Sequence, residues 1–282
     1  MTRISAQSRA IDPAVERPRL PGIVIALVAL ALVAISILPA MALAKPALAA
    51  GDRPTIVLVH GSWAGPSGWD QVVANLHKDG FATAAPTLDL ATLAGDVATV
   101  RATLDAIPGK KVLVGHSYGG MVISGAGYGR SDVRALVYTA GFVPDEGETA
   151  FGLLAAYPPS EAFSHLIPNP FPFVYIDPAI FPGVFCQDLS PKKAAELNAG
   201  QRPISVLAGY EPSGPVAWKT LPSWYAISGQ DLVINPALQE FMSARAGSTV
   251  VRFDEASHAG GFTHYAGRFV KLIEQAAAAT AG

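Results

Sequence analysis

The sequence of 282 residues contains one cysteine, Cys186, so no disulfide can form within the chain and no Cys/His cluster has metal-ligand spacing. We expect Cys186 to be a small buried apolar residue rather than a reactive thiol. Charged residues make up only 15% of the chain, the formal net charge is −2, and no long run of one sign occurs. Basic and aromatic residues do not alternate in any stretch, so nucleic acid is excluded as an expected partner.

A long apolar run without charge occurs once, over residues 22–44. The polar segment before it carries Arg17 and Arg19, which would keep the N-terminus in the cytoplasm, and two small-residue sites follow its apolar centre. This order is typical of a secretory signal peptide. An uncleaved membrane anchor is the alternative, because about 20 apolar residues can span a bilayer, although Pro39 favours cleavage. We predict that residues 1–50 are a signal peptide or N-terminal membrane anchor, and that the rest of the chain is exported to the periplasm or beyond the cell. Contact with the membrane is then expected only through residues 22–44, if they stay uncleaved.

Residues 51–282 alternate short apolar runs rich in β-branched residues with stretches of helical spacing, which predicts an α/β fold with a mostly parallel sheet and helices on both faces. The predicted strands are Thr55–His60, Phe81–Ala85, Lys111–Gly115, Val133–Thr139, Ser223–Ser228 and Thr249–Phe253. The predicted helices are Trp69–Lys78, Gly95–Ile107, Tyr118–Tyr128, Pro236–Ala246 and Phe262–Ala279.

The alternation stops between about residues 142 and 222, where Pro, Phe and Tyr are frequent and only brief helical patches such as Pro191–Ala199 occur. An irregular stretch between two strands of one sheet indicates an inserted cap. Many of its aromatic rings would form the core of the cap itself.

Gly115-His-Ser117-Tyr-Gly119 matches the pattern G-x-S-x-G. The pattern alone is weak, but here an apolar strand enters it and a helix-capable stretch leaves it, as in a nucleophile elbow. Gly115 and Gly119 stand where a side chain would collide with neighbouring backbone. We therefore predict that Ser117 is a nucleophile at the carboxyl end of the sheet, where open α/β folds bind ligands.

A serine hydroxyl needs a base and an orienting carboxylate, which follow it in this fold in the order Ser, acid, His. His258 lies in a small-residue loop between the last strand and the last helix and is the predicted base, whereas His264 is expected a turn into that helix with a surface or packing role. Asp231 follows the strand ending at Ser228 and is the predicted acid. Asp145 is the second candidate, though it also suits a helix N-cap, and Asp254 could be a surface charge.

Backbone N–H groups must stabilise the oxyanion that forms on a substrate carbonyl. The N–H of Tyr118 is one expected donor, because it lies at the start of the helix after Ser117. The second should come from the Gly-rich loop after the first strand, where Ser62 is best placed.

With these residues assigned, the chain from about Thr55 to its C-terminus resembles the α/β-hydrolase superfamily, in particular small bacterial esterase-like members related to plant methylesterases and hydroxynitrile lyases. The resemblance rests on VLVHGSWAGPSGW, VLVGHSYGGMVI, ALVYTAGFVPDEGE, EPSGPVAWKTLPSWY and the Asp231/His258 pair. It implies a catalytic triad of Ser117, Asp231 and His258. Hydroxynitrile lyases of this type depend on a Lys directly after the catalytic His, and Ala259 stands at that place, which argues against lyase activity.

We therefore expect a serine esterase that needs no cofactor and whose partner is a small-molecule ester with a small or medium apolar group. Lactone opening, C–C hydrolysis and perhydrolysis on the same residues are alternatives, since one triad serves all of them. A binding protein on a hydrolase scaffold is the alternative from another class. Ser117 argues against epoxide hydrolases and dehalogenases, which use an Asp nucleophile. The sequence carries no signature of a particular oligomeric state.

Overall fold

The computed structural model describes residues 53–281, and the predicted export segment lies outside this range. Within residues 53–281, no helix has the length and apolar character needed to cross a membrane.

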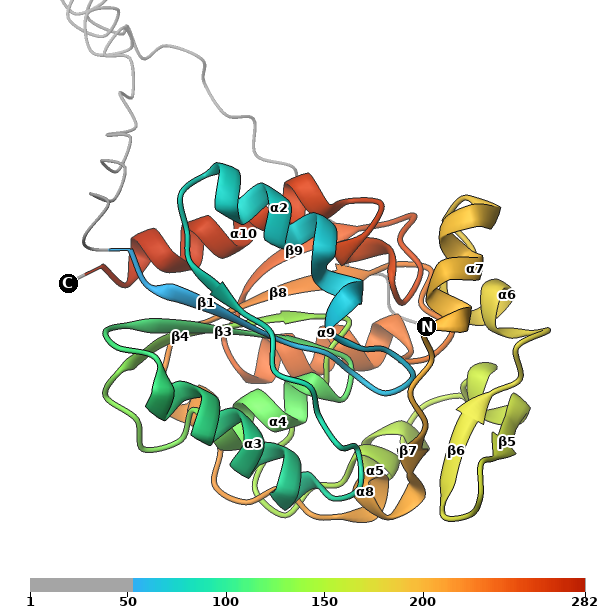
Figure 1. The fold of residues 1–282 in the computed structure, drawn as a ribbon. Coiled ribbons are helices and arrows are strands. Elements are labelled where there is room, and N and C mark those ends of the chain that lie inside the picture. The colour runs from blue at the N-terminus through green and yellow to red at the C-terminus, as the bar shows by residue number, and fades with distance from the viewer. Residues whose placement is uncertain (1–52, 282) are drawn as a thin grey trace, which may run out of the picture. The chain divides into compact units, whose positions relative to one another are not determined.

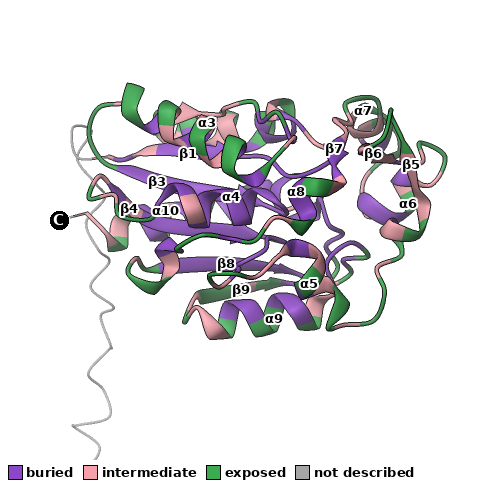
Figure 2. Ribbon diagram, turned by 90° about the horizontal axis from the view of Figure 1, so that it is seen from below, coloured by how far each residue is buried: buried purple, intermediate pink, exposed green. Residues whose placement is uncertain are grey.

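A six-stranded sheet in the order β2-β1-β3-β4-β8-β9 forms the centre of the described residues, and each of its strand pairs is parallel (Figure 1). The predicted parallel sheet is therefore confirmed. Central strands β3 and β8 are buried at every position, because they have a strand on either side and helices above and below (Figure 2). The strands are β1 (Thr55–Val59), β2 (Thr83–Ala84), β3 (Lys111–His116), β4 (Val133–Thr139), β8 (Ser223–Ser228) and β9 (Thr249–Phe253).

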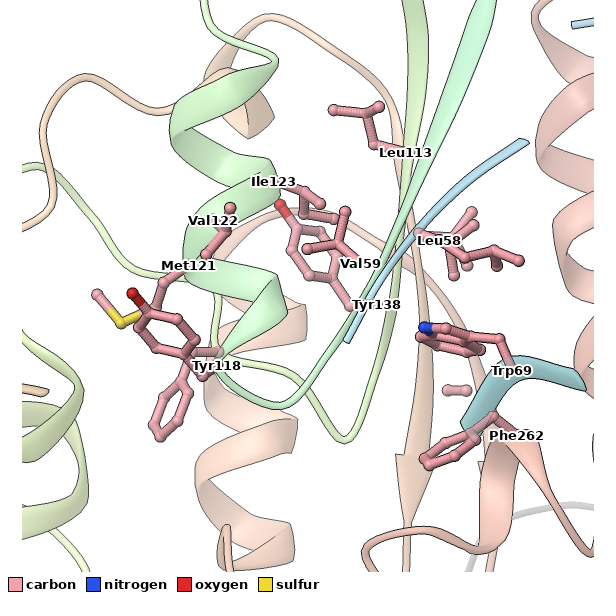
Figure 3. Packing of buried hydrophobic residues seen from close by; sticks show 14 of the residues in the cluster. Leu58, Val59, Trp69, Leu113, Tyr118, Met121, Val122, Ile123, Tyr138 and Phe262 are labelled. Carbon is pink, nitrogen blue, oxygen red and sulfur yellow. The ribbon is translucent and has the colours of Figure 1, made fainter. Parts of the chain in front are cut away.

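Helices cover both faces of this sheet: α2 and α10 pack on one face, and α3, α4 and α9 on the other (Figure 1). Trp69 and Phe262 fill the first face, while Val122, Ile123 and Tyr138 pack on the second (Figure 3). The helices are α2 (Asp70–Lys78), α3 (Leu93–Ala106), α4 (Gly119–Ala126), α9 (Pro236–Arg245) and α10 (Ala266–Ala279).

The last helix begins at Ala266, so the prediction that it starts at Phe262 is wrong. A 3-10 turn, η4 (Gly260–Phe262), precedes it. Gly261 packs closely on β4 at this turn, because a Cβ atom there would lie 2.6 Å from Thr139 Oγ1. The second strand is also shorter than predicted, because only Thr83 and Ala84 pair with β1.

Between β4 and β8 the chain leaves the sheet and builds a separate layer, which we call the cap. In Figure 1 its parts β5, β6, α6 and α7 lie beyond the carboxyl ends of the strands. Its strands form a three-stranded antiparallel sheet in the order β5-β6-β7. The elements of this stretch are α5 (Ala150–Ala155), η2 (Ala162–His165), β5 (Leu166–Pro168), β6 (Phe173–Ile176), α6 (Phe181–Phe185), α7 (Pro191–Ala199), β7 (Ile204–Ser205), α8 (Val206–Tyr210) and η3 (Ala217–Lys219).

The strand order reverses direction at β1. The chain moves from β1 to β2 at one edge, and then returns to β3 on the other side of β1 and continues outward to β9. Loops that leave β1 and β3 therefore run to opposite sides and open a crevice at the carboxyl ends of these two strands, the usual ligand site of an open α/β sheet.

Candidate active site

Ser117 occupies the sharp turn between β3 and α4, with a φ of 53°. A non-glycine residue in this left-handed region costs about 1–3 kcal/mol, and such strain concentrates at functional sites. The flanking glycines make the turn possible: a Cβ atom on Gly115 would lie 2.7 Å from the carbonyl oxygen of Gly119, and one on Gly119 would overlap the carbonyl oxygen of Val59. The structure therefore has the elbow geometry that the G-x-S-x-G pattern predicts.

Asp231 and His258 lie together at the same end of the sheet, although 27 residues separate them in the chain. Nδ1 of His258 is 2.7 Å from Oδ2 of Asp231, and both side chains are fully buried. Because a carboxylate only accepts, Nδ1–H is the donor and Nε2 is left as an acceptor. Nε2 is buried and has no hydrogen-bond partner among the described residues. An acceptor of this kind next to a serine elbow can take a proton from the serine hydroxyl.

The carboxylate of Asp231 is fixed by three further donors. Oδ1 accepts the backbone N–H groups of Val233 and Ile234 at 2.7 and 2.9 Å, and Oδ2 accepts Nε2 of Gln239 at 2.8 Å. Gln239 is fully buried and also accepts the N–H of Ser228 and donates to the carbonyl of Ile234. The sequence reasoning missed Gln239, and its signal would have been a polar residue on the buried face of α9, beside Leu238 and Met242.

His116 is a second residue that the sequence reasoning missed. It directly precedes Ser117, and its ring centroid lies 4.6 Å from that of His258. Its Nε2 is 3.1 Å from the carbonyl oxygen of His258, so Nε2–H donates and ties β3 to the loop that carries the predicted base. Complete burial holds the pKa of His116 well below its ordinary value, which keeps the ring neutral.

The backbone N–H groups of Ser62 and Tyr118 have no hydrogen-bond acceptor among residues 53–281, and both residues line the pocket that contains Ser117. His60 fixes the loop that carries Ser62: its Nδ1 is 2.9 Å from the carbonyl of Gly61, and its Nε2 accepts the N–H of Leu88 at 3.1 Å. Burial lowers the pKa of His60 to about 4, so this ring is neutral at pH 7. Two unpaired N–H groups on either side of a serine are the arrangement that an oxyanion hole requires.

The gaps between the atoms that line the pocket above Ser117, together with the open solvent at its mouth, amount to about 440 Å³. Its wall combines apolar side chains of the cap with three serines and carries no charged side chain. The hydroxyl of Tyr118 points out of the pocket toward Oδ2 of the buried Asp96, 2.9 Å away, so Tyr118 presents its ring. The lining residues are Ser62, Trp63, Ser117, Tyr118, Phe142, Ala150, Phe151, Phe163, Leu166, Val174, Ile204, Ser205, Val206, Gly209 and Val233.

The other candidate residues lie elsewhere or serve other contacts. Asp145 forms an ion pair with Lys219 and accepts the N–H of Glu146, so its predicted role as a helix N-cap is wrong; the hydroxyl of Thr149 caps α5 instead. Asp254 pairs with Arg252 at 2.7 Å on the surface.

His264 and Cys186 are also accounted for by the structure. His264 is exposed and lies before α10 rather than within it. Cys186 is buried, and desolvation raises the pKa of its thiol to about 12, as expected of an unreactive cysteine. Within residues 53–281, no group of three or more His, Cys, Asp or Glu side chains could hold a metal ion.

The architecture is that of an α/β hydrolase. A serine elbow follows the third strand of a parallel sheet, and an acid and a histidine follow later strands of the same sheet. The model of the alpha/beta hydrolase family matches residues 56–272, and the chain belongs to this family. The prediction of that family from the sequence is therefore confirmed.

The relatives carry the names of hydrolases and esterases. A carbendazim-hydrolyzing esterase from Nocardioides sp. is 37% identical over 124 residues, which cover 39% of this chain and 51% of that protein, or about half the length of the relative. The probable hydrolase R7 from Phoma sp. is 28% identical over 66% of this chain and 81% of its own. Among solved structures, a pyrethroid hydrolase matches with a TM-score of 0.67 at 22% identity, over 81% of this chain and 99% of that one. This last likeness demonstrates the fold.

Proposed function

We propose that this protein is a serine esterase that cleaves carboxylic esters of small or medium apolar substrates through an acyl-enzyme on Ser117. The observation that carries the proposal is the state of His258, whose Nδ1 is bound to Asp231 while its buried Nε2 has no partner. A buried polar atom without a hydrogen-bond partner lowers the stability of the fold. A reaction in which Nε2 accepts a proton would explain why the protein keeps such an atom here.

In the proposed reaction, Nε2 of His258 takes the proton from Ser117 Oγ as that oxygen attacks the ester carbonyl. The negative charge that forms on the carbonyl oxygen is stabilised by the N–H groups of Ser62 and Tyr118. His258 then gives the proton to the departing alcohol oxygen, which leaves an acyl group on Ser117. Water loses a proton to the same Nε2, attacks the acyl carbon and releases the acid, and Ser117 recovers its proton.

The pocket supports an uncharged apolar substrate. Its wall has no charged side chain to bind an anion or a cation, and its serine hydroxyls are small. An apolar acyl or alcohol group would therefore gain from leaving water, whereas a charged group would lose hydration without compensation. The esterase name of the Nocardioides relative favours the same reaction type.

We also propose that the protein is exported, either released or held by residues 22–44. The charge-free stretch behind a basic segment supports this. Fractionation of producing cells, with immunodetection of the chain in each fraction, tests it. Recovery of the full-length chain in the cytoplasm alone would contradict export.

The first test of the esterase proposal uses the full-length protein and a fluorophosphonate probe, which reacts with an activated serine. The wild type should be labelled and should hydrolyse p-nitrophenyl butyrate. Ser117→Ala should abolish both, and His258→Ala should reduce both by about 10³-fold or more. A wild type that is folded but not labelled would refute the proposal and favour a binding protein on this scaffold.

The second test separates the two candidate acids. Asp231→Asn should reduce kcat by about 10⁴-fold: the amide oxygen stays with the N–H groups of Val233 and Ile234, so the NH2 group faces Nδ1 of His258 and favours the wrong tautomer. Asp145→Asn is the matched control, since it makes the same chemical change at a residue paired with Lys219 on the surface. A larger loss in Asp145→Asn than in Asp231→Asn would show that the acid is misassigned.

A further inference from the structure

The cap contacts the loop that carries His258 through a short segment at the end of α6, residues 185–188. The ring of Phe185 packs edge-on against the imidazole of His258 with 4.8 Å between centroids, and the carbonyl of Phe185 accepts the N–H of Ala259 at 3.0 Å. Gln187 donates from Nε2 to the carbonyl of Gln230, the residue before Asp231. The segment therefore contacts the chain next to both members of the Asp231/His258 pair.

Asp188 makes the most specific of these contacts. Its Oδ1 accepts the hydroxyl of Ser257, the residue before His258, and its backbone carbonyl is 3.2 Å from Nδ1 of His264. Its Oδ2 lies at the place that a Cβ atom on residue 260 would need, so a side chain there would collide with it. One cap residue thus holds the loop on both sides of His258.

Stability alone does not account for a carboxylate at this place. Oδ2 of Asp188 is buried and has no hydrogen-bond partner among the described residues. Such a group costs free energy of folding, and a well-packed apolar residue would be at least as stable. Proteins keep a polar group that lowers stability at places where the orientation of a functional group matters more than stability.

The loop needs an external support because it has no regular structure of its own. Residues 254–259 form neither helix nor strand between β9 and η4. A hydrogen bond to Asp231 fixes one atom of the imidazole, but the direction of Nε2 also depends on where the backbone of His258 lies. A displacement of about 1 Å at a catalytic group can reduce a rate by about 10²-fold.

We propose that Asp188 is a positioning residue: through Ser257 and Gly260 it sets the backbone of the loop so that Nε2 of His258 meets the hydroxyl of Ser117. This inference rests on the proposed esterase function, because it assigns to the cap a part in building the catalytic geometry. It predicts that the rate, and not the binding of substrate, depends on the Asp188–Ser257 contact.

The test measures the second-order rate of fluorophosphonate labelling of Ser117, and kcat and KM for p-nitrophenyl butyrate, on the full-length protein. Asp188→Ala should slow labelling and lower kcat by about 10- to 100-fold with KM changed less than about threefold. Asp188→Asn should stay within about threefold of the wild type, because its amide oxygen still accepts the Ser257 hydroxyl. Ser257→Ala should also slow the reaction, by no more than Asp188→Ala does, because the contact of Asp188 with Gly260 stays; the double variant should lose no more than Asp188→Ala alone.

A control removes a comparable polar contact far from the loop. Asp132→Ala breaks the contacts of Asp132 with Lys111 and Arg130 beside β3 and should leave both rates unchanged below its unfolding temperature. Three results would each overturn the proposal. They are a wild-type rate in Asp188→Ala, equal losses of rate in Asp188→Asn and Asp188→Ala, and additive losses of rate in the double variant.

If Asp188→Ala does not fold, the Ser257→Ala variant tests the proposal in its place. A wild-type rate of labelling in Ser257→Ala then overturns the proposal. Absence of labelling in the wild type would instead refute the esterase function itself, so the two failures are distinguishable.

Discussion

Replacing Gln239 by leucine removes a fully buried amide that fixes the carboxylate of Asp231. Gln239 Nε2 donates to Asp231 Oδ2 at 2.8 Å and to the carbonyl of Ile234 at 2.8 Å, and Oε1 accepts the N–H of Ser228 at 3.0 Å. Leucine fills much of the same volume but leaves these three partners without the amide. The variant should therefore be less stable and also less active.

The magnitude follows from the groups left unpaired. The N–H of Ser228 and the carbonyl of Ile234 each lose a buried partner at about 1–3 kcal/mol, while Asp231 Oδ2 keeps the bond from His258. The two groups together cost about 2–6 kcal/mol, and apolar packing by leucine offsets part of this, so the free energy of unfolding should fall by about 1–4 kcal/mol. With one donor fewer, the carboxylate of Asp231 can rotate and His258 with it, and fluorophosphonate labelling should slow about tenfold.

Urea unfolding and the labelling rate measure the two effects on the same protein. Met242→Ala is the matched control, because Met242 is also fully buried on α9 and its truncation costs about 2–5 kcal/mol. Its labelling rate should equal that of the wild type in conditions where it is folded. Equal slowing in both variants would refute the reasoning, since the loss of rate would then follow stability and not the contact with Asp231.

Two further predictions concern the loop beside Ser117. Gly61→Ala should slow labelling by about 10²-fold, because the added Cβ would lie 2.6 Å from the Cβ of Ser117. Gly214 has open space around it, so Gly214→Ala is the control and should be labelled at the wild-type rate. Equal labelling rates in the two variants would contradict the prediction. For His60 the folded pKa of about 4 lies below the ordinary 6.5, so its contribution to stability is fully present above pH 6.5 and is lost as the pH falls toward 4. Wild-type protein should lose about 3 kcal/mol through this group over that interval in urea unfolding, and His60→Gln should lose less; identical pH curves would contradict the assignment.

The strands and the elbow were predictable because they depend on local sequence. Strands β4, β8 and β9 begin and end at the predicted residues, since each is a run of β-rich residues between turn residues. Gly115, Ser117 and Gly119 identify the elbow because the pattern stands between an apolar strand and a helix-capable stretch. Asp231 and His258 were expected at the carboxyl edge of the sheet because they come after strands. Asp145 and Asp254 also follow strands, and the resemblance to the hydrolase family added weight to Asp231.

The supporting residues could not be predicted, because their contacts join distant parts of the chain. His116 meets the carbonyl of a residue 142 positions later, and Asp188 meets a hydroxyl 69 positions later. Local sequence suggests neither pairing. Asp145 shows the converse error: a carboxylate after a strand suited a helix cap, but α5 starts later and Thr149 caps it.

The cap also supports the loop of Ser62, the residue proposed as the second oxyanion donor. Trp63 donates from its backbone N–H to the carbonyl of Arg202 at 3.1 Å and from Nε1 to the carbonyl of Val174 at 3.1 Å, and Val174 itself lines the pocket. Regular sheet geometry fixes Ser117, whereas the loops of Ser62 and His258 depend in part on the cap for their positions. Substitutions that reshape the pocket through the backbone of β6 should therefore also move the proposed oxyanion donor. If Ser62 has that role, we expect substrate preference and rate to change together when these cap residues are replaced.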